Sequence, residues 1–225
     1  LTVFNNEIYF QAYDITNGYE LWKYNISMEI MVADINPGSG SSYPKYLAVF
    51  NDALYFNAYS SQGGVTSGEE LWMYDGVNAP SMVADINTGT SNSLPDYLTV
   101  FKNELYFRAN DGTNREELWK TDGTATGTVM VADIHPASGS YPGDLTVFNN
   151  ELYFQADDGT NGIELWKTYG TATGTVMVAD IRSGIGGSSP TQLTVFNNEL
   201  YFQAFDANTH YELWKTDGTA IGTVM

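Results

Sequence analysis

The chain repeats a pattern of apolar and polar positions that is typical of β-strands. In residues 145–192, a β-branched and aromatic run (145–148) is followed by two asparagines and then by an alternating run, 151–156. Asn149 and Asn150 tolerate positive φ, so these two runs are predicted to form a hairpin. Residues 164–168 and 175–181 form a second such pair around a turn rich in Gly and Thr. The segment is therefore predicted to contain four antiparallel strands.

This segment occurs five times along the chain. The phrase Leu-Thr-Val-Phe, or Leu-Ala-Val-Phe, opens each copy at Leu1, Leu47, Leu98, Leu145 and Leu193. The repeats therefore span residues 1–46, 47–97, 98–144, 145–192 and 193–225. The second repeat carries an insertion at residues 60–68. The fifth stops at Met225, where the others continue with Val-Ala-Asp-Ile and a connector that contains proline.

The repeat predicts the architecture of the chain. Its third and fourth strands place apolar residues next to each other, as expected when both faces of a sheet are covered by other sheets. Four antiparallel strands in a repeat of about 40–50 residues are typical of propeller blades. We therefore predict an all-β fold: one five-bladed β-propeller domain over 1–225, with four-stranded blades at the repeat boundaries, an incomplete fifth blade and almost no helix. The alternative is a β-helical solenoid, but its rungs are shorter and parallel, whereas Asn-Asn turns require antiparallel neighbours.

A motif in the third strand and the turn after it carries a family resemblance. Residues 117–124 and 212–219 both read Glu-Leu-Trp-Lys-Thr-Asp-Gly-Thr. This sequence resembles the motif of the bacterial ELWxxDGT repeat proteins, and the resemblance covers all five repeats. It implies a large protein that is secreted or exposed at the cell surface. The turn is also similar to the Asp-box turns of sialidase-like propellers, which implies a structural role for it. Tyr169 replaces the Asp in the fourth repeat, and the first two repeats depart from the motif after Trp.

Composition excludes several classes of partner. The chain has 27 acidic and 9 basic residues and a formal net charge of −18. Such a polyanion repels nucleic-acid phosphates and anionic lipid surfaces. The absence of cysteine excludes disulfides and thiolate metal sites. No apolar run reaches the length of a membrane span, so we expect no membrane insertion.

Oxygen-bearing side chains recur at constant spacing on one predicted face of the repeats. In three repeats, the loop between the predicted second and third strands and the start of the third strand supply an Asp, an Asn and a Glu. These are Asp14, Asn17 and Glu20; Asp111, Asn114 and Glu117; and Asp158, Asn161 and Glu164. Such ligands suit Ca²⁺, so these residues are candidate calcium ligands and Ca²⁺ is the candidate cofactor. The alternative interpretation, which is the commoner role of repeated acids in a propeller, is that they accept hydrogen bonds from backbone N–H groups between blades.

Aromatic residues fall into two predicted classes. The tyrosines of the Leu-Tyr-Phe phrase, for example Tyr9 and Tyr153, repeat inside strands and are expected to pack between blades. Tyrosines in the Gly- and Ser-rich connectors are not buried by default, which makes them candidate ligand contacts. These candidates are Tyr43, Tyr46, Tyr97 and Tyr141. Asn25 begins an Asn-Ile-Ser sequence and is a candidate glycosylation site.

The sequence predicts a binding function more than a catalytic one. A glycosidase needs two acids in unlike environments, and near-identical repeats produce like environments. We therefore predict a non-enzymatic, extracellular propeller whose repeated shallow sites bind a polyvalent carbohydrate by avidity. One alternative is a self-assembling subunit of an extracellular filament or surface layer, because an incomplete fifth blade leaves an edge that another chain can pair with. A glycosidase is the second alternative. The expected partners are glycans or copies of the chain itself, in a homo-oligomer or polymer.

Overall fold

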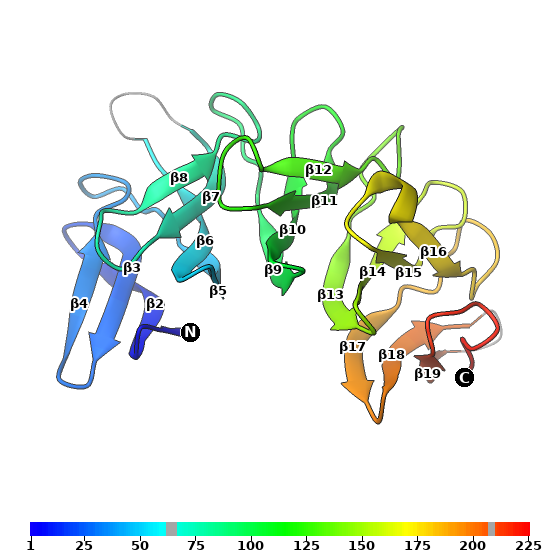
Figure 1. Ribbon diagram of the computed structural model, residues 1–225. Helices are drawn as coiled ribbons and strands as arrows, with labels where there is room; N and C mark the ends of the chain where they lie inside the picture. Colours follow the sequence, from blue (N-terminus) through cyan, green and yellow to red (C-terminus); the bar gives the residue numbers. More distant parts are fainter. Residues whose placement is uncertain (62–66, 207–209) are drawn as a thin grey trace. The chain divides into compact units, whose positions relative to one another are not determined.

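A computed structural model describes residues 1–61, 67–206 and 210–225, which form five antiparallel sheets, one from each repeat (Figure 1). The first sheet is β1 (Thr2–Phe4), β2 (Glu7–Asp14), β3 (Gly18–Asn25) and β4 (Met28–Ala33). The second is β5 (Lys45–Phe50), β6 (Ala53–Tyr59), β7 (Glu69–Tyr74) and β8 (Ser81–Ala84). The third is β9 (Asp96–Phe101), β10 (Glu104–Asn110), β11 (Glu116–Thr121) and β12 (Val129–Ala132). The fourth is β13 (Gly143–Phe148), β14 (Glu151–Asp157), β15 (Ile163–Thr168) and β16 (Val176–Ala179), and the fifth is β17 (Thr191–Phe196), β18 (Glu199–Phe205) and β19 (Tyr211–Thr216).

The prediction of an all-β chain is confirmed. In the described residues, helical structure is limited to one 3₁₀ turn, η2 (Ala172–Gly174), which lies in the turn of the fourth repeat. The fifth sheet has three strands, followed by an isolated bridge between Lys215 and Val224. Most of the insertion predicted at 60–68 lies outside the described residues.

The two-residue turns have the backbone that their sequence predicts. Asn149 and Asn150 have φ of 47° and 61°, and they join β13 to β14 as expected for a tight hairpin turn. The same left-handed pair occurs at the first turn of the other repeats. These pairs are Asn5 and Asn6, Asn51 and Asp52, Lys102 and Asn103, and Asn197 and Asn198.

Each connector feeds its next strand through a proline and a bulge. β5, β9, β13 and β17 begin directly after Pro44, Pro95, Pro142 and Pro190. The residue before each proline has positive φ, for example Tyr43 at 49°. This differs from the extended backbone expected before proline. In the first connector, the backbone N–H groups of Ser42 and Tyr43 both donate to the Tyr19 carbonyl and hold the chain in this conformation. A second left-handed residue, such as Tyr46 at 56°, lies at the register shift in the strand.

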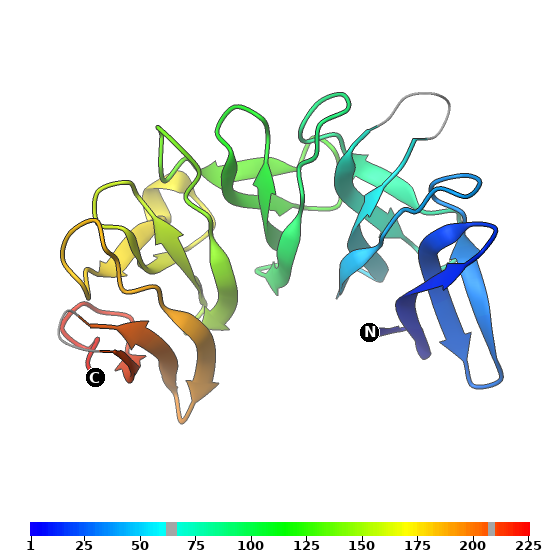
Figure 2. The ribbon, with the colours of Figure 1, turned by 180° about the vertical axis from the view of Figure 1, so that it is seen from behind.

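The described chain forms two compact units, and the third sheet contributes strands to both. The first unit contains residues 1–113 and 120–129, and the second contains residues 114–119 and 130–225. Within the second unit the fourth and fifth sheets pack face to face, with β13 beside β17 (Figure 2). The first and second sheets pack in the same way within the first unit.

These two pairs of sheets use the same two faces for this packing. We call the face that packs on the next repeat the forward face; in the first sheet it carries Phe4, Tyr9 and Leu21. The opposite, backward face of the second sheet carries Leu54, Phe56 and Ala58. Among the Leu-Tyr-Phe tyrosines, Tyr9 and Tyr153 are buried between sheets as predicted, and Tyr55 and Tyr106 are also at most 3% exposed. Tyr201 in the fifth repeat differs from the prediction, because it is only partly buried.

Candidate functional site

The glutamate at the start of the third strand is fully buried in the first four repeats. Glu164 shows its contacts: one carboxylate oxygen accepts from the backbone N–H of Ile181 at 3.1 Å and from Ser188 Oγ at 2.5 Å. The other oxygen accepts from the backbone N–H of Arg182 at 3.1 Å. The same pairing joins Glu20 to Ser42, Glu70 to Ser93 and Glu117 to Ser140. We call each pair a Glu–Ser junction.

The serine of each junction connects neighbouring sheets. Ser188 donates its backbone N–H to the Ile163 carbonyl at 2.8 Å, next to Glu164 on β15. Its own carbonyl accepts from the backbone N–H of Phe205, at the end of β18 in the following sheet, at 2.8 Å. The junction therefore ties a third strand, the connector and the next sheet together at one buried point.

The aspartates predicted to share a metal with these glutamates bond elsewhere. Asp14 Oδ1 accepts from the backbone N–H groups of Thr16 at 2.7 Å and Asn17 at 2.8 Å. Asn17 Nδ2 donates to Asp14 Oδ2 at 2.9 Å, and the hydrogen bonds from Asn17 hold the pKa of Asp14 below its usual value. Asp158 and Asn161 form the same loop in the fourth repeat. These two residues close the loop between the second and third strands.

In the first and fourth repeats, the Asp–Asn pair and the glutamate of the predicted calcium site have different hydrogen-bond partners. Among residues 1–61, 67–206 and 210–225, no three His, Asp or Glu side chains are grouped so that they could hold a metal ion. The buried glutamates accept backbone N–H groups, which is the contact that the alternative interpretation requires. Calcium binding by Asp14, Glu20 and their equivalents stays a prediction.

Three exposed tyrosines lie together in the first repeat. Tyr13 on β2 and Tyr19 on β3 are cross-strand partners, and their ring centroids are 5.0 Å apart. Tyr43, in the connector, stacks on Tyr19 with centroids 5.5 Å apart and ring planes at 26°. Their exposed fractions are 58%, 40% and 42%. Lys45 Nζ lies 5.6 Å from the centre of the Tyr43 ring. We call Tyr13, Tyr19 and Tyr43 the tyrosine cluster.

Backbone contacts hold the tyrosine cluster in place. The backbone N–H of Tyr43 donates to the Tyr19 carbonyl at 3.1 Å, and the backbone N–H of Tyr19 donates to Ser41 Oγ at 2.9 Å. Gly18, with φ of 74°, lets the connector approach, because a Cβ there would lie 2.5 Å from Ser41 Oγ and 2.6 Å from the Gly40 carbonyl oxygen. The cluster is therefore fixed before any ligand arrives.

Substituting Gly18 by alanine is expected to displace Tyr19 and Tyr43 and to lower the free energy of unfolding by about 2 kcal/mol, because the clash is added to the unfavourable left-handed backbone. Gly38 is the matched control, since it also has positive φ, 90°, but has open space where a Cβ would point. Gly38→Ala should cost about 1 kcal/mol. Urea unfolding of both variants compares the two costs, and equal costs would contradict the role given to the close approach.

The other predicted tyrosines have different surroundings. The Arg108 guanidinium lies 5.0 Å from the centre of the Tyr97 ring and forms an ion pair with Asp96. Tyr46 and Tyr141 are 53% and 45% exposed. Sequence reasoning selected Tyr43 but missed Tyr13 and Tyr19. Tyr13 is the last residue but one of β2 and Tyr19 is the second residue of β3, so strand pairing places them opposite each other beside the short loop that joins these strands. This position is the signal that could have identified them.

A second aromatic pair occupies the equivalent register in the fifth sheet. Phe205 and Tyr211 are cross-strand partners with ring centroids 5.6 Å apart, and Tyr211 is exposed. The Arg182 guanidinium stacks on Phe205 at 4.6 Å from the ring centre. The first and fifth repeats therefore both carry an aromatic pair next to the loop that joins their second and third strands.

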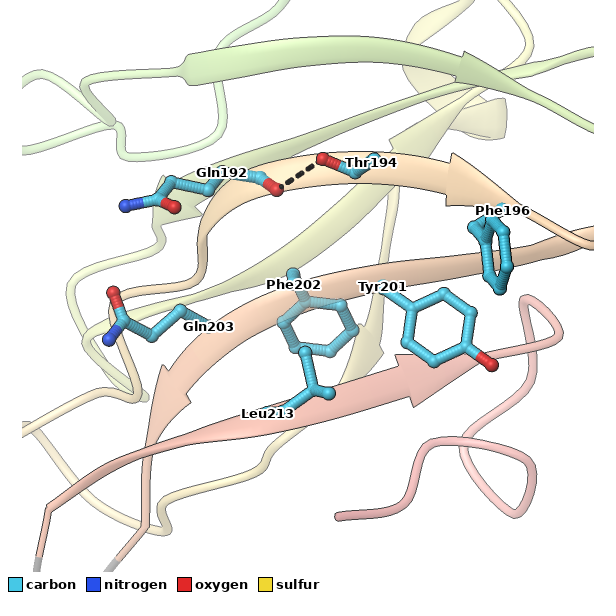
Figure 3. A pocket seen from close by; sticks show the side chains of 7 residues that line it. All are labelled: Gln192, Thr194, Phe196, Tyr201, Phe202, Gln203 and Leu213. Carbon is cyan, nitrogen blue, oxygen red and sulfur yellow. Dashed lines mark hydrogen bonds between the residues drawn. The ribbon is translucent and has the colours of Figure 1, made fainter.

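The forward face of the fifth sheet borders an open hollow of 470 Å³ (Figure 3). Phe196 on β17, Tyr201 on β18 and Leu213 on β19 face it. Its remaining lining residues are Gln192, Thr194, Phe202 and Gln203.

The predicted glycosylation site lies in the turn between β3 and β4. Asn25 Oδ1 accepts from Ser27 Oγ at 3.0 Å and from the backbone N–H of Met28 at 3.3 Å. Glycosylation of Asn25 stays a prediction.

No helix within the described ranges is long and apolar enough to cross a membrane.

Comparison with known proteins identifies the type of fold. No family model and no curated protein matches the chain. It is similar to puromycin hydrolase, with a TM-score of 0.57 and 13% identity over 92% of this chain and 33% of that one. It is also similar to TolB from Acinetobacter baumannii, with a TM-score of 0.53 and 13% identity over 95% of this chain and 51% of that one. A third similar structure is the β-propeller domain of the Trilobed protease from Pyrococcus furiosus, with a TM-score of 0.54 and 10% identity over 89% of this chain and 59% of that one.

These similarities support a β-propeller type of fold for the five sheets. The chain spans between about a third and three fifths of the lengths of the three structures. At 10–13% identity the similarity concerns the fold alone.

Proposed function

We propose that the chain is a non-enzymatic carbohydrate-binding module of an extracellular repeat protein of the ELWxxDGT type, with its five sheets acting as propeller blades. The observation that carries this proposal is the tyrosine cluster. Three large rings, each at least 40% exposed, are held together at the surface by backbone hydrogen bonds.

Such a platform suits a sugar ring chemically. A tyrosine ring presents an apolar face to the C–H groups of a pyranose, and its hydroxyl remains available to sugar hydroxyls. Tyrosine also loses little conformational entropy on binding, because it has only two side-chain torsions. The contacts among Tyr13, Tyr19 and Tyr43 reduce this loss further, since the rings are already packed.

The net charge narrows the class of glycan. A chain of charge −18 repels uronic acids and sulfated sugars over the range of the Debye length. Lys45 lies beside Tyr43, but its one positive charge is small compared with the net charge of −18. We therefore propose neutral polysaccharides as the ligand class.

Two aromatic sites in one chain support multivalent binding. The Phe205–Tyr211 pair repeats the register of Tyr13 and Tyr19, with Arg182 in place of a third ring. A long polysaccharide that reaches both sites binds more tightly than either site alone, because the second contact is intramolecular. The buried carboxylates of the Glu–Ser junctions already accept several hydrogen bonds each, which favours binding over hydrolysis as the role of these repeats.

Replacing Tyr19 or Tyr43 by alanine is expected to weaken binding by about tenfold or more, since each loses a stacking face and its partner ring. Affinity electrophoresis in gels containing β-glucan, xylan, mannan or galactan measures retardation of the wild type and the variants. Tyr46→Ala is the matched control, because Tyr46 is an exposed connector tyrosine outside the cluster. Equal retardation of the Tyr46 and Tyr19 variants would remove the cluster from the proposal, and release of reducing sugar would replace it with a glycosidase.

A further inference from the structure

An ion pair and a tyrosine ring lie together at the start of β9 in the third sheet. Arg108 Nε donates to Asp96 Oδ1 at 2.9 Å, and Arg108 Nη2 donates to Asp96 Oδ2. The guanidinium carbon of Arg108 lies 5.0 Å from the centre of the Tyr97 ring. Asp96 is only 7% exposed, whereas Tyr97 is 39% exposed. We call Asp96, Tyr97 and Arg108 the arginine–tyrosine stack.

A β-bulge places Tyr97 outside the regular strand. The register between β9 and β10 shifts here, so that Tyr97 and Leu98 lie opposite the single residue Phe107. A bulge of this kind changes the direction in which a side chain points. Tyr97 has φ of 55°, and its carbonyl accepts from Thr99 Oγ1 at 3.0 Å. The ring is therefore held at the surface by a defined backbone.

The other sheets share the bulge but lack the ion pair. In the third sheet, Asp96 pairs with Arg108 across β9 and β10. At the same position, the second, fourth and fifth sheets carry Lys45 opposite Asn57, Gly143 opposite Gln155, and Thr191 opposite Gln203. Burying an ion pair costs desolvation energy that the attraction between the charges often does no more than offset. Three sheets form the bulge without this pair, so the fold does not require it.

The arginine–tyrosine stack combines an open ring face with a hydrogen-bond donor. The guanidinium covers one face of Tyr97, which leaves the opposite face for a ligand. Nε and Nη2 of Arg108 bond to Asp96, whereas Nη1 has no acceptor in the part of the chain that the structure describes. Asp96 also balances the charge of Arg108. A ring face beside a neutralised N–H donor suits the C–H groups and hydroxyls of an uncharged sugar.

We infer that the arginine–tyrosine stack is a further binding site for a neutral sugar unit, and that it shares no residue with the tyrosine cluster. Tyr97 stacks on the pyranose ring, and Arg108 Nη1 donates to a hydroxyl oxygen of the same sugar. Asp96 is a positioning residue, because its two hydrogen bonds keep the guanidinium against the ring. The inference rests on the proposed function, since both sites bind the same class of ligand and together increase avidity.

Replacing Tyr97 by alanine is expected to weaken binding by about fivefold, because the variant loses the stacking face. Affinity electrophoresis in gels containing β-glucan, xylan, mannan or galactan compares it with the wild type. Tyr46→Ala is the matched control, because Tyr46 occupies the same bulge position in the second sheet, where no ion pair lies beside it. Wild-type retardation of the Tyr97 variant in every gel that retards the wild type would overturn the inference.

Substituting Arg108 by lysine separates the presentation of Tyr97 from stability. Lysine can keep the ion pair with Asp96, but it offers no planar face to the ring. The midpoint of urea unfolding should therefore be unchanged, whereas binding should weaken by about threefold. Asp96→Gly combined with Arg108→Gln copies the fourth sheet without leaving a buried charge unpaired, and this double variant should fold and bind as weakly as Tyr97→Ala. Wild-type binding by both variants would assign the ion pair to the fold alone and contradict the inference.

Combined variants distinguish this site from the tyrosine cluster. In a chain that already carries Tyr19→Ala, adding Tyr97→Ala should weaken the remaining binding by about fivefold again, because the two sites contribute separately. If Tyr19→Ala weakens binding and adding Tyr97→Ala changes nothing, the inference fails and the proposed function stands. If Tyr97→Ala alone weakens binding, the site of the third sheet stands and the tyrosine cluster does not. A wild type that no gel retards contradicts both.

Discussion

Replacing Glu70 by alanine is expected to lower the free energy of unfolding by about 3–5 kcal/mol. Its carboxylate is fully buried and accepts from Ser93 Oγ at 2.6 Å, from the backbone N–H of Ile86 at 3.0 Å and from that of Ser93 at 3.2 Å. Alanine leaves these donors buried without an acceptor and adds a cavity. Because the Ser93 carbonyl also accepts from the backbone N–H of Asn110 at 2.9 Å, the loss extends to β10 in the third sheet.

The fifth repeat supplies a matched control for this substitution. Glu212 has the same place in its strand, but it is exposed. Glu212→Ala should change the free energy of unfolding by no more than about 0.5 kcal/mol. Urea unfolding followed by circular dichroism gives both values, and hydrogen exchange should accelerate at residues 86–93 in the Glu70 variant alone. Similar losses in the two variants would show that the Glu–Ser junction contributes nothing beyond the strand it lies on.

The architecture was readable from the sequence because local chemistry and repetition agree. Asn149 and Asn150 tolerate the left-handed backbone that a tight hairpin turn needs, and the structure places both residues there. Because the pattern is repeated, neighbouring copies bury the same apolar residues against each other. The burial of Tyr9 and Tyr153 between sheets follows directly from this repetition.

The serine partners of the buried glutamates were not predicted, because the two residues of each pair lie far apart in the sequence. The register of the acids was compatible with a shared ion and with hydrogen bonds from backbone N–H groups. Glu164 accepts from the Ser188 hydroxyl and from backbone N–H groups, whereas Asp158 closes its own loop. One signal was available: a serine lies two residues before the proline that directly precedes the first strand of each following repeat, at nearly constant distance from the glutamate, as in Ser42 and Pro44. A buried Glu and a buried Ser repeated together predict a hydrogen bond before they predict a metal.

Of the tyrosine cluster, only Tyr43 was predicted from the sequence, for a similar reason. Tyr43 was selected because connectors are exposed, and it is 42% exposed. Its stacking on Tyr19 depends on a left-handed residue directly before Pro44, a conformation that proline normally disfavours. Sequence rules that describe one residue and its neighbour do not predict such a backbone, because the connector and β3 impose it together through hydrogen bonds.

Stability is expected to fall as pH rises from about 4.5 to about 7. Burial raises the pKa of Glu70 from 4.5 to about 7, against the opposing effect of its hydrogen bonds from Ser93 and the backbone. Between these two values the folded protein keeps a proton that the unfolded chain has released, so the free energy of unfolding decreases with pH and levels off above the folded pKa. A shift of this size corresponds to about 3 kcal/mol. Glu20, Glu117 and Glu164 shift in the same direction for the same cause.

Glu70→Gln isolates this contribution, because glutamine has no proton to release. The wild type should exceed the variant in stability by about 3 kcal/mol more at pH 4.5 than at pH values above about 7. Glu212→Gln, at the exposed equivalent, should keep the full pH dependence of the wild type. Carboxyls with lowered pKa, such as Asp14, titrate below this window and affect all three proteins equally. Parallel curves for wild type and Glu70→Gln would mean that the buried carboxyl ionises at its ordinary pKa, because the effect of its hydrogen bonds on the pKa balances that of its burial.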